Sequence, residues 1–215
     1  IIVPILKAIN DLRDEVRENR QEIKEMKVER VVIGKQYETC DNYEEFKRIV
    51  NLKKINVNTV EAGNKISIEN GLYFIVLWPS SANMISDNAI NNNSLVVKLV
   101  YKNFSMFFTG DIEEIAEKTI LSKYAGKNEI LKSDILKVAH HGSKTSSTKE
   151  FISAVEPQYA VIGVGKENKF GHPADETIKI LQDRNVKIYR TDFLGEIWIR
   201  ANAISIQMNG FLDSS

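Results

Sequence analysis

Cysteine is almost absent from this sequence of 215 residues, which contains only Cys40. A single thiol forms no disulfide within the chain and supplies too few ligands for a cysteine-rich zinc site, so both are excluded. The sequence also has no excess of either charge, because its 29 lysines and arginines are balanced by 29 aspartates and glutamates. This balance excludes a bulk electrostatic attraction to nucleic acid or anionic lipid, and it leaves room for a local basic patch.

Several segment types are missing as well. No apolar run approaches the ~20 residues of a membrane-spanning helix, and no signal peptide follows the first residue. The sequence has no G-x-S-x-G, G-x-G-x-x-G or P-loop pattern, so nothing indicates a serine hydrolase, a dinucleotide-binding protein or a P-loop NTPase. Hydrophobic residues make up 43%, enough for the core of one domain over residues 1–215. The chain starts with Ile1 rather than Met, and we expect it to begin inside a longer protein.

The first part of the chain is predicted to combine helices with β-hairpins. Apolar residues at helical spacing predict a helix over residues 1–27, and the charged stretch at 10–29 indicates a solvated face or, alternatively, a partner-binding helix. The sequence Glu69–Asn70–Gly71 is typical of a tight turn between two strands. The other elements expected here are a helix at 42–51, a loop at 79–93 and strands at 28–34, 54–60, 65–68, 72–77, 95–100 and 106–109.

Strands and helices alternate in the second part of the chain. We predict helices at 112–124, 148–155 and 174–184 and strands at 135–139, 159–164, 187–189, 196–200 and 203–207. Hairpins followed by strand–helix alternation predict an α/β fold with two sheets and helices outside them.

Three segments at predicted strand ends carry side chains suited to chemistry. The first is the strand that runs into Thr109–Gly110–Asp111, where a glycine permits a tight bend before a helix. Carboxyl ends of strands are where α/β proteins place their sites, so Asp111 is a candidate ligand or catalytic residue. The alternative is that Asp111 caps the following helix.

The second segment ends a buried strand in His140–His141–Gly142–Ser143. Adjacent side chains on an extended segment point to opposite faces, so one histidine is expected to face a metal ion. The other histidine is then free to hold substrate or to orient the first. A structural role for a histidine at a strand end is the alternative.

Hydroxyl groups and a lysine follow the paired histidines and lead into a helix. Free N–H groups at a helix N-terminus suit an anionic phosphate. Ser147 and Glu150 have the spacing of a capping box, so an ordinary serine-rich cap is the alternative. On the first interpretation, the substrate-binding residues are Ser143, Lys144, Thr145 and Ser146.

The third segment contains His172, just before Pro173 and a predicted helix. The positive end of that helix disfavours a protonated imidazole, which predicts a neutral ring able to bind metal or substrate. Capping or packing is the alternative. All three histidines of the chain lie in the second and third segments. A carboxylate upstream of imidazoles is the ligand mix of a Zn²⁺ or Mn²⁺ hydrolase.

These motifs resemble those of the metallo-β-lactamase superfamily, and most of all its ComEC-type branch, the C-terminal hydrolase domain of competence DNA-uptake proteins. The motifs are TGD at 109–111, LKVAHHGS at 136–143, GHP at 171–173 and RTD at 190–192, with looser matches in NNSLV at 92–96 and EAGN at 61–64. The resemblance implies a four-layer αββα sandwich with two divalent metal ions, Zn²⁺ or Mn²⁺, at one edge. It implies that Asp111 bridges the metals and that His140, slightly favoured over His141, is a further ligand. His141 and His172 are then expected to act with Asp111 in catalysis, where His172 touches phosphate or transfers a proton.

One motif of that family is missing. Its main metal motif, H-x-(H/D)-x-D-H, precedes the first helix, and this sequence has no such pattern. The opening IIVPIL resembles the helix that follows the motif, so we expect an N-terminally incomplete domain rather than one that has lost the motif. With Asp111 and one histidine carried over, metal binding by the chain alone is expected to be weak, because catalytic zinc usually has three protein ligands.

The resemblance implies metal-dependent hydrolysis of a phosphodiester, with single-stranded DNA as a natural substrate. Two alternatives stay open, namely a stand-alone hydrolase of a small phosphoester such as a phosphorylcholine ester and a degenerate, non-catalytic binding domain. A stand-alone protein is expected in the cytoplasm, and a DNA-uptake protein is expected to be attached to the cytoplasmic membrane. A local basic patch for DNA is expected from Lys137, Lys144, Lys149, Lys166 and Lys169.

Overall fold

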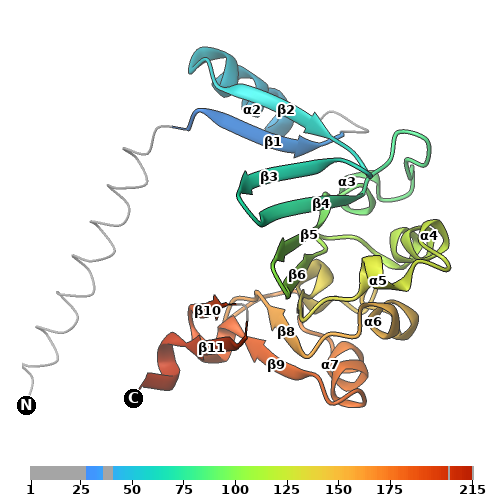
Figure 1. Ribbon diagram of the computed structural model, residues 1–215, viewed down its shortest axis with the longest axis vertical. Coiled ribbons are helices and arrows are strands. Elements are labelled where there is room, and N and C mark those ends of the chain that lie inside the picture. The colour runs from blue at the N-terminus through green and yellow to red at the C-terminus, as the bar shows by residue number, and fades with distance from the viewer. Residues whose placement is uncertain (1–27, 36–40, 203, 215) are drawn as a thin grey trace, which may run out of the picture.

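Seven strands form a mixed sheet in the order β3-β4-β5-β6-β7-β8-β9 in the computed structural model, which describes residues 28–35, 41–202 and 204–214 (Figure 1). The antiparallel part consists of β3 (Lys65–Glu69), β4 (Leu72–Trp78), β5 (Val96–Tyr101) and β6 (Phe104–Phe108). The parallel part continues from β6 through β7 (Ile135–Lys137), β8 (Tyr159–Ile162) and β9 (Lys187–Arg190). The carboxyl ends of β6 to β9 therefore meet at one edge, and the loops after them share a surface.

Helices cover one face of this sheet (Figure 1). They are α4 (Glu114–Lys123), α5 (Asn128–Leu131), α6 (Lys149–Val155) and α7 (Asp175–Gln182). The rings of Phe107 on β6 and Phe151 on α6 meet edge to face with their centroids 6.0 Å apart. Full burial of such a side chain stabilises the fold by about 1.5–3 kcal/mol, so this core holds the strand ends in fixed positions. Other completely buried members are Ile120, Leu136, Ile162 and Leu181.

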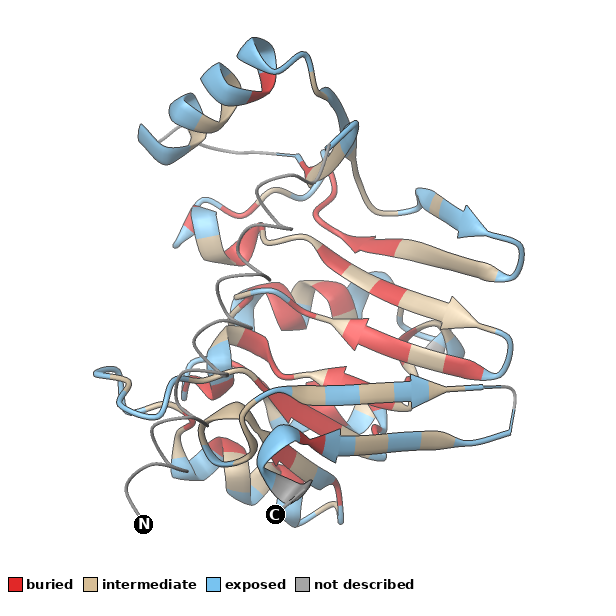
Figure 2. Cartoon of the chain, turned by 90° about the vertical axis from the view of Figure 1, so that its left-hand side faces the viewer, coloured by how far each residue is buried: buried red, intermediate tan, exposed pale blue. Residues whose placement is uncertain are grey.

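A two-stranded antiparallel hairpin, β10 (Ile197–Ala201) and β11 (Ile206–Gly210), lies over the opposite face (Figures 1 and 2). Intermediate and exposed residues alternate along its strands, as the colours in Figure 2 show, and the apolar side chains pack against a second buried cluster on the sheet. That cluster consists of Phe104, Met106, Ile135 and Val161, and the hairpin contributes Ile197, Ile199, Ala201, Ile206 and Met208. The period of two along each strand explains why one face of the hairpin is buried and the other faces solvent.

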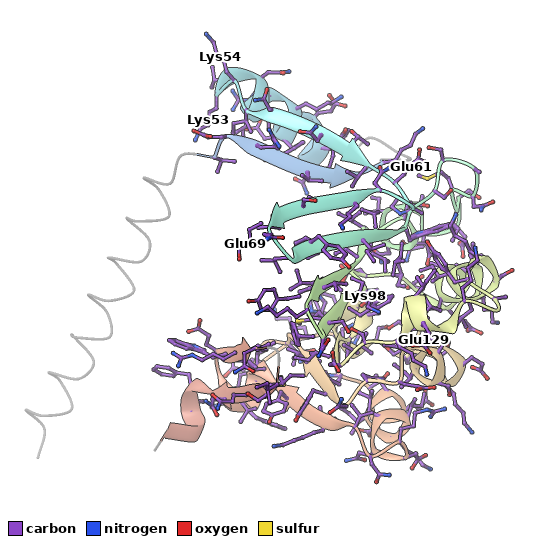
Figure 3. The ribbon with its side chains drawn as sticks, viewed as in Figure 1. Lys53, Lys54, Glu61, Glu69, Lys98 and Glu129 are labelled. Atoms are coloured by element: carbon purple, nitrogen blue, oxygen red, sulfur yellow. The ribbon has the colours of Figure 1, made fainter. Side chains whose placement is uncertain are left out.

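A separate unit precedes the large sheet. β1 (Arg30–Gly34) pairs in parallel with β2 (Asn56–Val60), and α2 (Asp41–Leu52) connects them. Lys53 and Lys54, labelled in Figure 3, lie at the turn between α2 and β2, far from the paired histidines in the chain. The unit meets the sheet at Gly34, where an added Cβ would lie 3.3 Å from the Pro79 ring.

β5 carries one buried cation, Lys98, which lies near Glu129 of α5 (Figure 3). Its Nζ donates hydrogen bonds to the carbonyl oxygens of Glu129 (3.3 Å), Ile130 (3.4 Å) and Lys132. Burial lowers the pKa of Lys98, and attraction to Asp134 and Glu129 opposes that shift. The last carbonyl groups of a helix have no partner within it, and the Lys98 ammonium group provides hydrogen bonds for those at the end of α5.

The predicted α/β fold class is confirmed by this large mixed sheet with its helices. The predicted strands of the described residues are all present, with ends shifted by a few residues. Short elements that we did not predict are α3 (Ala89–Asn92), α5 and α8 (Thr191–Leu194). The helix predicted over residues 1–27 lies outside the described residues, as does Cys40. Among the helices that the structure describes, none combines the length and apolar character needed to cross a membrane.

Candidate functional site

Three loops meet at the carboxyl edge of the sheet, one after each of β6, β7 and β8. The backbone N–H of His140 donates to the carbonyl oxygen of Gly110 at 3.0 Å, which joins the first loop to the second. The N–H of Ala174 donates to the carbonyl oxygen of Gly142 at 2.8 Å, which joins the second loop to the third. The loops bring together Asp111 and all three histidines of the chain.

Asp111 follows a bend that only glycine fits. Gly110 has a φ of +58°, and a Cβ added there would lie 2.6 Å from the Cβ of Ser94. Ser94 Oγ accepts a hydrogen bond from the N–H of Asp111 at 3.2 Å, and Asn92 Oδ1 accepts one from the N–H of Glu113 at 3.0 Å. The loop is therefore fixed by residues of the preceding strand connection, a role that the sequence analysis did not predict. Asp111 does not cap α4, because Glu113 occupies the N-cap position.

The paired histidines lie in a left-handed turn, and our prediction of an extended strand there is wrong. β7 ends at Lys137, and Ala139–Gly142 forms a short 3-10 segment with φ of +45° at His140 and +55° at His141. Left-handed backbone costs roughly 1–2 kcal/mol for an L-residue, so the neighbouring loops must hold it in place. Both rings consequently face carboxylates of the loop after β6, instead of pointing to opposite faces of a strand.

His141 is directed at Asp111. Its Nε2 lies 3.8 Å from Asp111 Oδ1, and its Nδ1 lies 2.5 Å from the carbonyl oxygen of Gly163. A carbonyl only accepts, so Nδ1 carries a proton, and Nε2 is the ring nitrogen directed at the carboxylate. Two ligands of one tetrahedral zinc ion lie roughly 3.4 Å apart at the usual bond lengths, and the observed separation is close to that.

His140 faces a different carboxylate, that of Glu113. His140 Nδ1 lies 3.5 Å from Glu113 Oε1, is buried and has no hydrogen-bond partner among the described residues. The Glu113 carboxylate is held on both sides, since Oε1 accepts from Thr145 Oγ1 at 2.9 Å and Oε2 accepts from Asn88 Nδ2 at 3.0 Å. Glu113 could not be recognised from the sequence, because a glutamate at the start of a helix is usually a solvated residue.

His172 joins the cluster from the loop after β8. Its ring meets that of His140 at a centroid distance of 5.8 Å, and the Phe170 ring stacks on it at 6.0 Å. Asn168 fixes the backbone of His172 by accepting from its N–H at 2.9 Å and donating to its carbonyl oxygen at 2.8 Å. Burial lowers the pKa of His172, and positive charge on His140 and His141 lowers it further. Both causes favour the neutral ring, and burial, rather than the helix end named above, is the first of them.

The residues predicted to bind phosphate divide into exposed and buried ones. Lys144 and Thr145 are exposed beside the histidine turn. Ser143 is buried, and its Oγ shares a hydrogen bond of 3.0 Å with Thr145 Oγ1. Ser146 is buried as well, and its Oγ donates to the carbonyl oxygen of Ala139 at 3.1 Å. Direct contact with a phosphate is therefore open to Lys144 in this arrangement, because the Thr145 hydroxyl already donates its proton to Glu113.

A carboxylate occupies the N-terminus of α6, where we expected phosphate. Glu117 of α4 accepts hydrogen bonds from the N–H groups of Ser147 (2.5 Å) and Thr148 (2.8 Å) and from the hydroxyl of Thr148 (2.7 Å). The predicted capping box of Ser147 with Glu150 is wrong, because Thr148 is the N-cap and accepts from the N–H of Phe151. The N–H groups of Ser147 and Thr148 are thus already satisfied by the carboxyl group of Glu117.

The donor set fits part of a metal site. Asp111 and His141 offer a carboxylate oxygen and an imidazole nitrogen, which are ligand types of Zn²⁺ and Mn²⁺. Within residues 28–35, 41–202 and 204–214, no three His, Cys, Asp or Glu side chains gather closely enough to hold an ion. The described residues therefore supply two suitable ligands in one place, fewer than the three protein ligands of an ordinary catalytic zinc ion.

Comparison with known proteins relates the chain to competence proteins, although no protein-family model matches it. ComE operon protein 3 of Bacillus subtilis (strain 168) is 32% identical over 188 residues, which are 87% of this chain and 23% of that protein. Competence protein ComA of Neisseria gonorrhoeae is 34% identical over 128 residues, which are 60% of this chain and 18% of that protein. Among solved structures, a mutant of CmlA beta-hydroxylase covers 75% of this chain and 38% of its own, with 12% identity and a TM-score of 0.46.

The chain spans less than a quarter of the length of these two curated relatives. Over most of its own length, it is similar to one part of these larger proteins.

Proposed function

We propose that this chain carries part of a metal-dependent hydrolase site that acts on phosphodiesters. The observation that supports the proposal best is the relation of His141 to Asp111, in which an imidazole fixed by a backbone carbonyl turns its free nitrogen to a carboxylate 3.8 Å away. A backbone acceptor on the other ring nitrogen is the usual second partner of a metal-bound histidine. The similarity to a competence protein supports a role in DNA uptake, with DNA as the substrate.

Asp111 and His141 would hold the cation, which supplies Lewis acidity at a phosphoryl oxygen and lowers the pKa of a water molecule. In this assignment His141, rather than His140, is the imidazole ligand. The hydrogen bond from the N–H of His140 to the carbonyl oxygen of Gly110 holds the left-handed turn that directs His141 to its position.

The remaining residues bind the substrate and move protons. Lys144, exposed beside the turn, would bind the non-bridging oxygens of the phosphodiester. Attack of a water oxygen on phosphorus forms one P–O bond and breaks the ester P–O bond. The neutral imidazole of His172 accepts the proton that the water loses, and the leaving oxygen takes up a proton in turn.

Metal binding and hydrolysis by the purified chain test this proposal together. Calorimetric titration with Mn²⁺ and hydrolysis of bis-p-nitrophenyl phosphate are measured for the wild type and for Asp111→Ala. The matched control is Asp183→Ala, which removes an exposed carboxylate beyond the end of α7. Because two protein ligands hold a metal ion weakly, we expect weak Mn²⁺ binding and slow hydrolysis by the wild type, loss of both in Asp111→Ala and retention of both in the control.

Equal metal binding and equal hydrolysis rates in wild type and Asp111→Ala would reject Asp111 as a ligand and this site as the catalytic one. Mn²⁺ binding without hydrolysis of the diester, together with hydrolysis of p-nitrophenyl phosphorylcholine, would assign the site to a small phosphoester instead.

A further inference from the structure

Exposed aromatic rings are concentrated in the part of the chain that follows β8. Within the described part of the chain, every phenylalanine or tryptophan that is more than half exposed lies in the loop after β8, in α8, on β10 or in the C-terminal 3-10 segment. These residues are Phe170 (82% exposed), Phe193 (64%), Trp198 (52%) and Phe211 (55%). Apolar rings scattered singly over a surface are common, but four on neighbouring segments form a patch that calls for a physical explanation.

Contacts between the segments link the parts of the chain that carry these rings, starting from the candidate site. Phe170 stacks on His172. The loop after β8 is joined to α8 by Thr191, whose Oγ1 accepts from the N–H of Val164 at 2.7 Å and donates to its carbonyl oxygen at 2.8 Å. α8 carries Phe193 and ends at Gly195, which lies against the side chains of Phe211 and Leu212.

The far end of this surface is a hollow on the outer face of the hairpin. It has a volume of about 270 Å³ and is lined by Trp198, Arg200, Gln207, Asn209, Gly210 and Phe211. Trp198 lies opposite Asn209 and Arg200 lies opposite Gln207 in the register of the two strands. Aromatic rings, side-chain amides and a guanidinium group therefore point to the same side, the side that Figure 2 shows as exposed.

Positive groups lie beside the rings. Lys169 is exposed next to Phe170, and Arg200 is exposed two residues from Trp198 on the same strand face. The Arg190 guanidinium lies 4.1 Å from the centroid of the Phe193 ring, but Asp192 neutralises its charge. Glu167 and Glu196 lie in the same segments, so positive charge is present in small excess only.

We propose that this surface, consisting of Phe170, Phe193, Trp198, Arg200 and Phe211, binds single-stranded nucleic acid by stacking its bases on the rings. Proteins that bind single strands combine aromatic platforms with cations along the backbone, and each stacked base contributes independently of sequence. An apolar peptide would not require cations beside the rings, whereas a phosphate backbone does. The proposal rests on the proposed function, because a strand lying on these rings would run past His172 to the site of hydrolysis.

Tryptophan fluorescence offers a direct test, since the chain has only two tryptophans. Trp78 is completely buried and donates its Nε1 to the carbonyl oxygen of Asn92, so a ligand on the surface changes the emission of Trp198 alone. The probe is an oligothymidylate of about 12 nucleotides, within the length range of known single-strand sites. We expect quenching with the single strand and little change with a duplex of the same length.

Two variants and one control define the surface by fluorescence anisotropy of a labelled oligothymidylate. Phe170→Ala and Trp198→Ala are each expected to weaken binding about ten-fold or more, as the loss of one stacked base does. The control is Ile204→Ala, at the hairpin turn away from the hollow, where Ile204 is 96% exposed and its removal leaves affinity unchanged. Circular dichroism spectra identical to that of the wild type show that the variants fold.

The ionic strength dependence is also specified by the structure. Lys166, Lys169 and Arg200 are the cations available to contact phosphates. The logarithm of the association constant should therefore fall with the logarithm of the salt concentration with a slope no steeper than about −2. All titrations contain EDTA, so binding is measured without metal and should persist in Asp111→Ala. Loss of hydrolysis in that variant with retained binding separates the two proposals.

Three results would overturn the inference. One is absence of quenching in a chain that hydrolyses bis-p-nitrophenyl phosphate. Another is wild-type affinity in both aromatic variants. The third is self-association of the chain in sedimentation velocity that Trp198→Ala abolishes, because the rings would then cover a second copy instead.

Discussion

Glu117 on α4 and Thr148 before α6 form a pair in which one carboxylate oxygen, Oε2, accepts from both the N–H and the hydroxyl of Thr148, at 2.8 and 2.7 Å. The carboxyl group is completely buried between the two helices. Burial raises the pKa of Glu117, and its hydrogen bonds to Thr148 and Ser147 oppose that shift. These hydrogen bonds hold the segment that follows the histidines against α4 in the helix layer.

Glu117→Gln should therefore change how stability depends on pH. The folded protein retains the proton of Glu117 to a higher pH than the unfolded chain, whose glutamate pKa is about 4.3. Its contribution is thus fully present below that value and is lost as pH rises through the raised folded-state pKa. In urea unfolding, the free-energy difference between wild type and Glu117→Gln should decrease with rising pH. A difference that grows with pH would contradict the assigned shift, and Glu176→Gln, an exposed carboxyl on α7, serves as the control.

His141→Ala should reduce metal binding more than His140→Ala. Nε2 of His141 faces Asp111, whereas Nδ1 of His140 lies beside Glu113 and away from that carboxylate. Titration of Mn²⁺ into each variant, followed by electron paramagnetic resonance, measures the affinity. We expect a loss of ten-fold or more for His141→Ala, the size of effect that even an outer-shell partner produces. The reverse order would assign the ligand to His140, as the family resemblance implied.

Asp192→Asn tests the RTD motif, which the structure shows as a structural contact. Arg190 donates to Asp192 through Nε at 3.0 Å and through Nη2 at 2.6 Å. These hydrogen bonds lower the pKa of Asp192, so its contribution is present above the unfolded value of about 3.9 and is lost as pH falls through the folded one. We expect the variant to be about 1–2 kcal/mol less stable at neutral pH and to approach the wild type in acid. A deficit independent of pH would show that charge is not the cause.

The strands of the sheet could be predicted because their signals are local. The apolar residues of β4 and β5 and the turn at Asn70–Gly71 carry enough information by themselves, and the motifs marked where the site lies. The conformation of His140 and His141 could not be predicted in this way, since their positive φ depends on contacts from other loops. The carbonyl oxygen of Gly110 accepts a hydrogen bond from the N–H of His140, and the carbonyl oxygen of Gly142 accepts one from the N–H of Ala174. Glu113 and Glu117 were missed for the same reason, because their partners lie some thirty residues away in the chain.

Gly110→Ala should damage the site through packing, and the chain offers a matched comparison. Gly110 and Gly126 both have positive φ, +58° and +75°, so alanine at either position costs roughly 1–2 kcal/mol for the left-handed backbone. A Cβ at Gly126 meets nothing within 4 Å, but one at Gly110 lies 2.6 Å from the Cβ of Ser94, whose Oγ holds the N–H of Asp111. In urea unfolding, we expect Gly110→Ala to lose more stability than Gly126→Ala by about 1–3 kcal/mol, the usual cost of overpacking.

Because the clash displaces Asp111, Mn²⁺ affinity should fall in Gly110→Ala and stay at the wild-type value in Gly126→Ala. Equal losses of stability in the two variants, with metal binding intact, would show that Ser94 does not position Asp111.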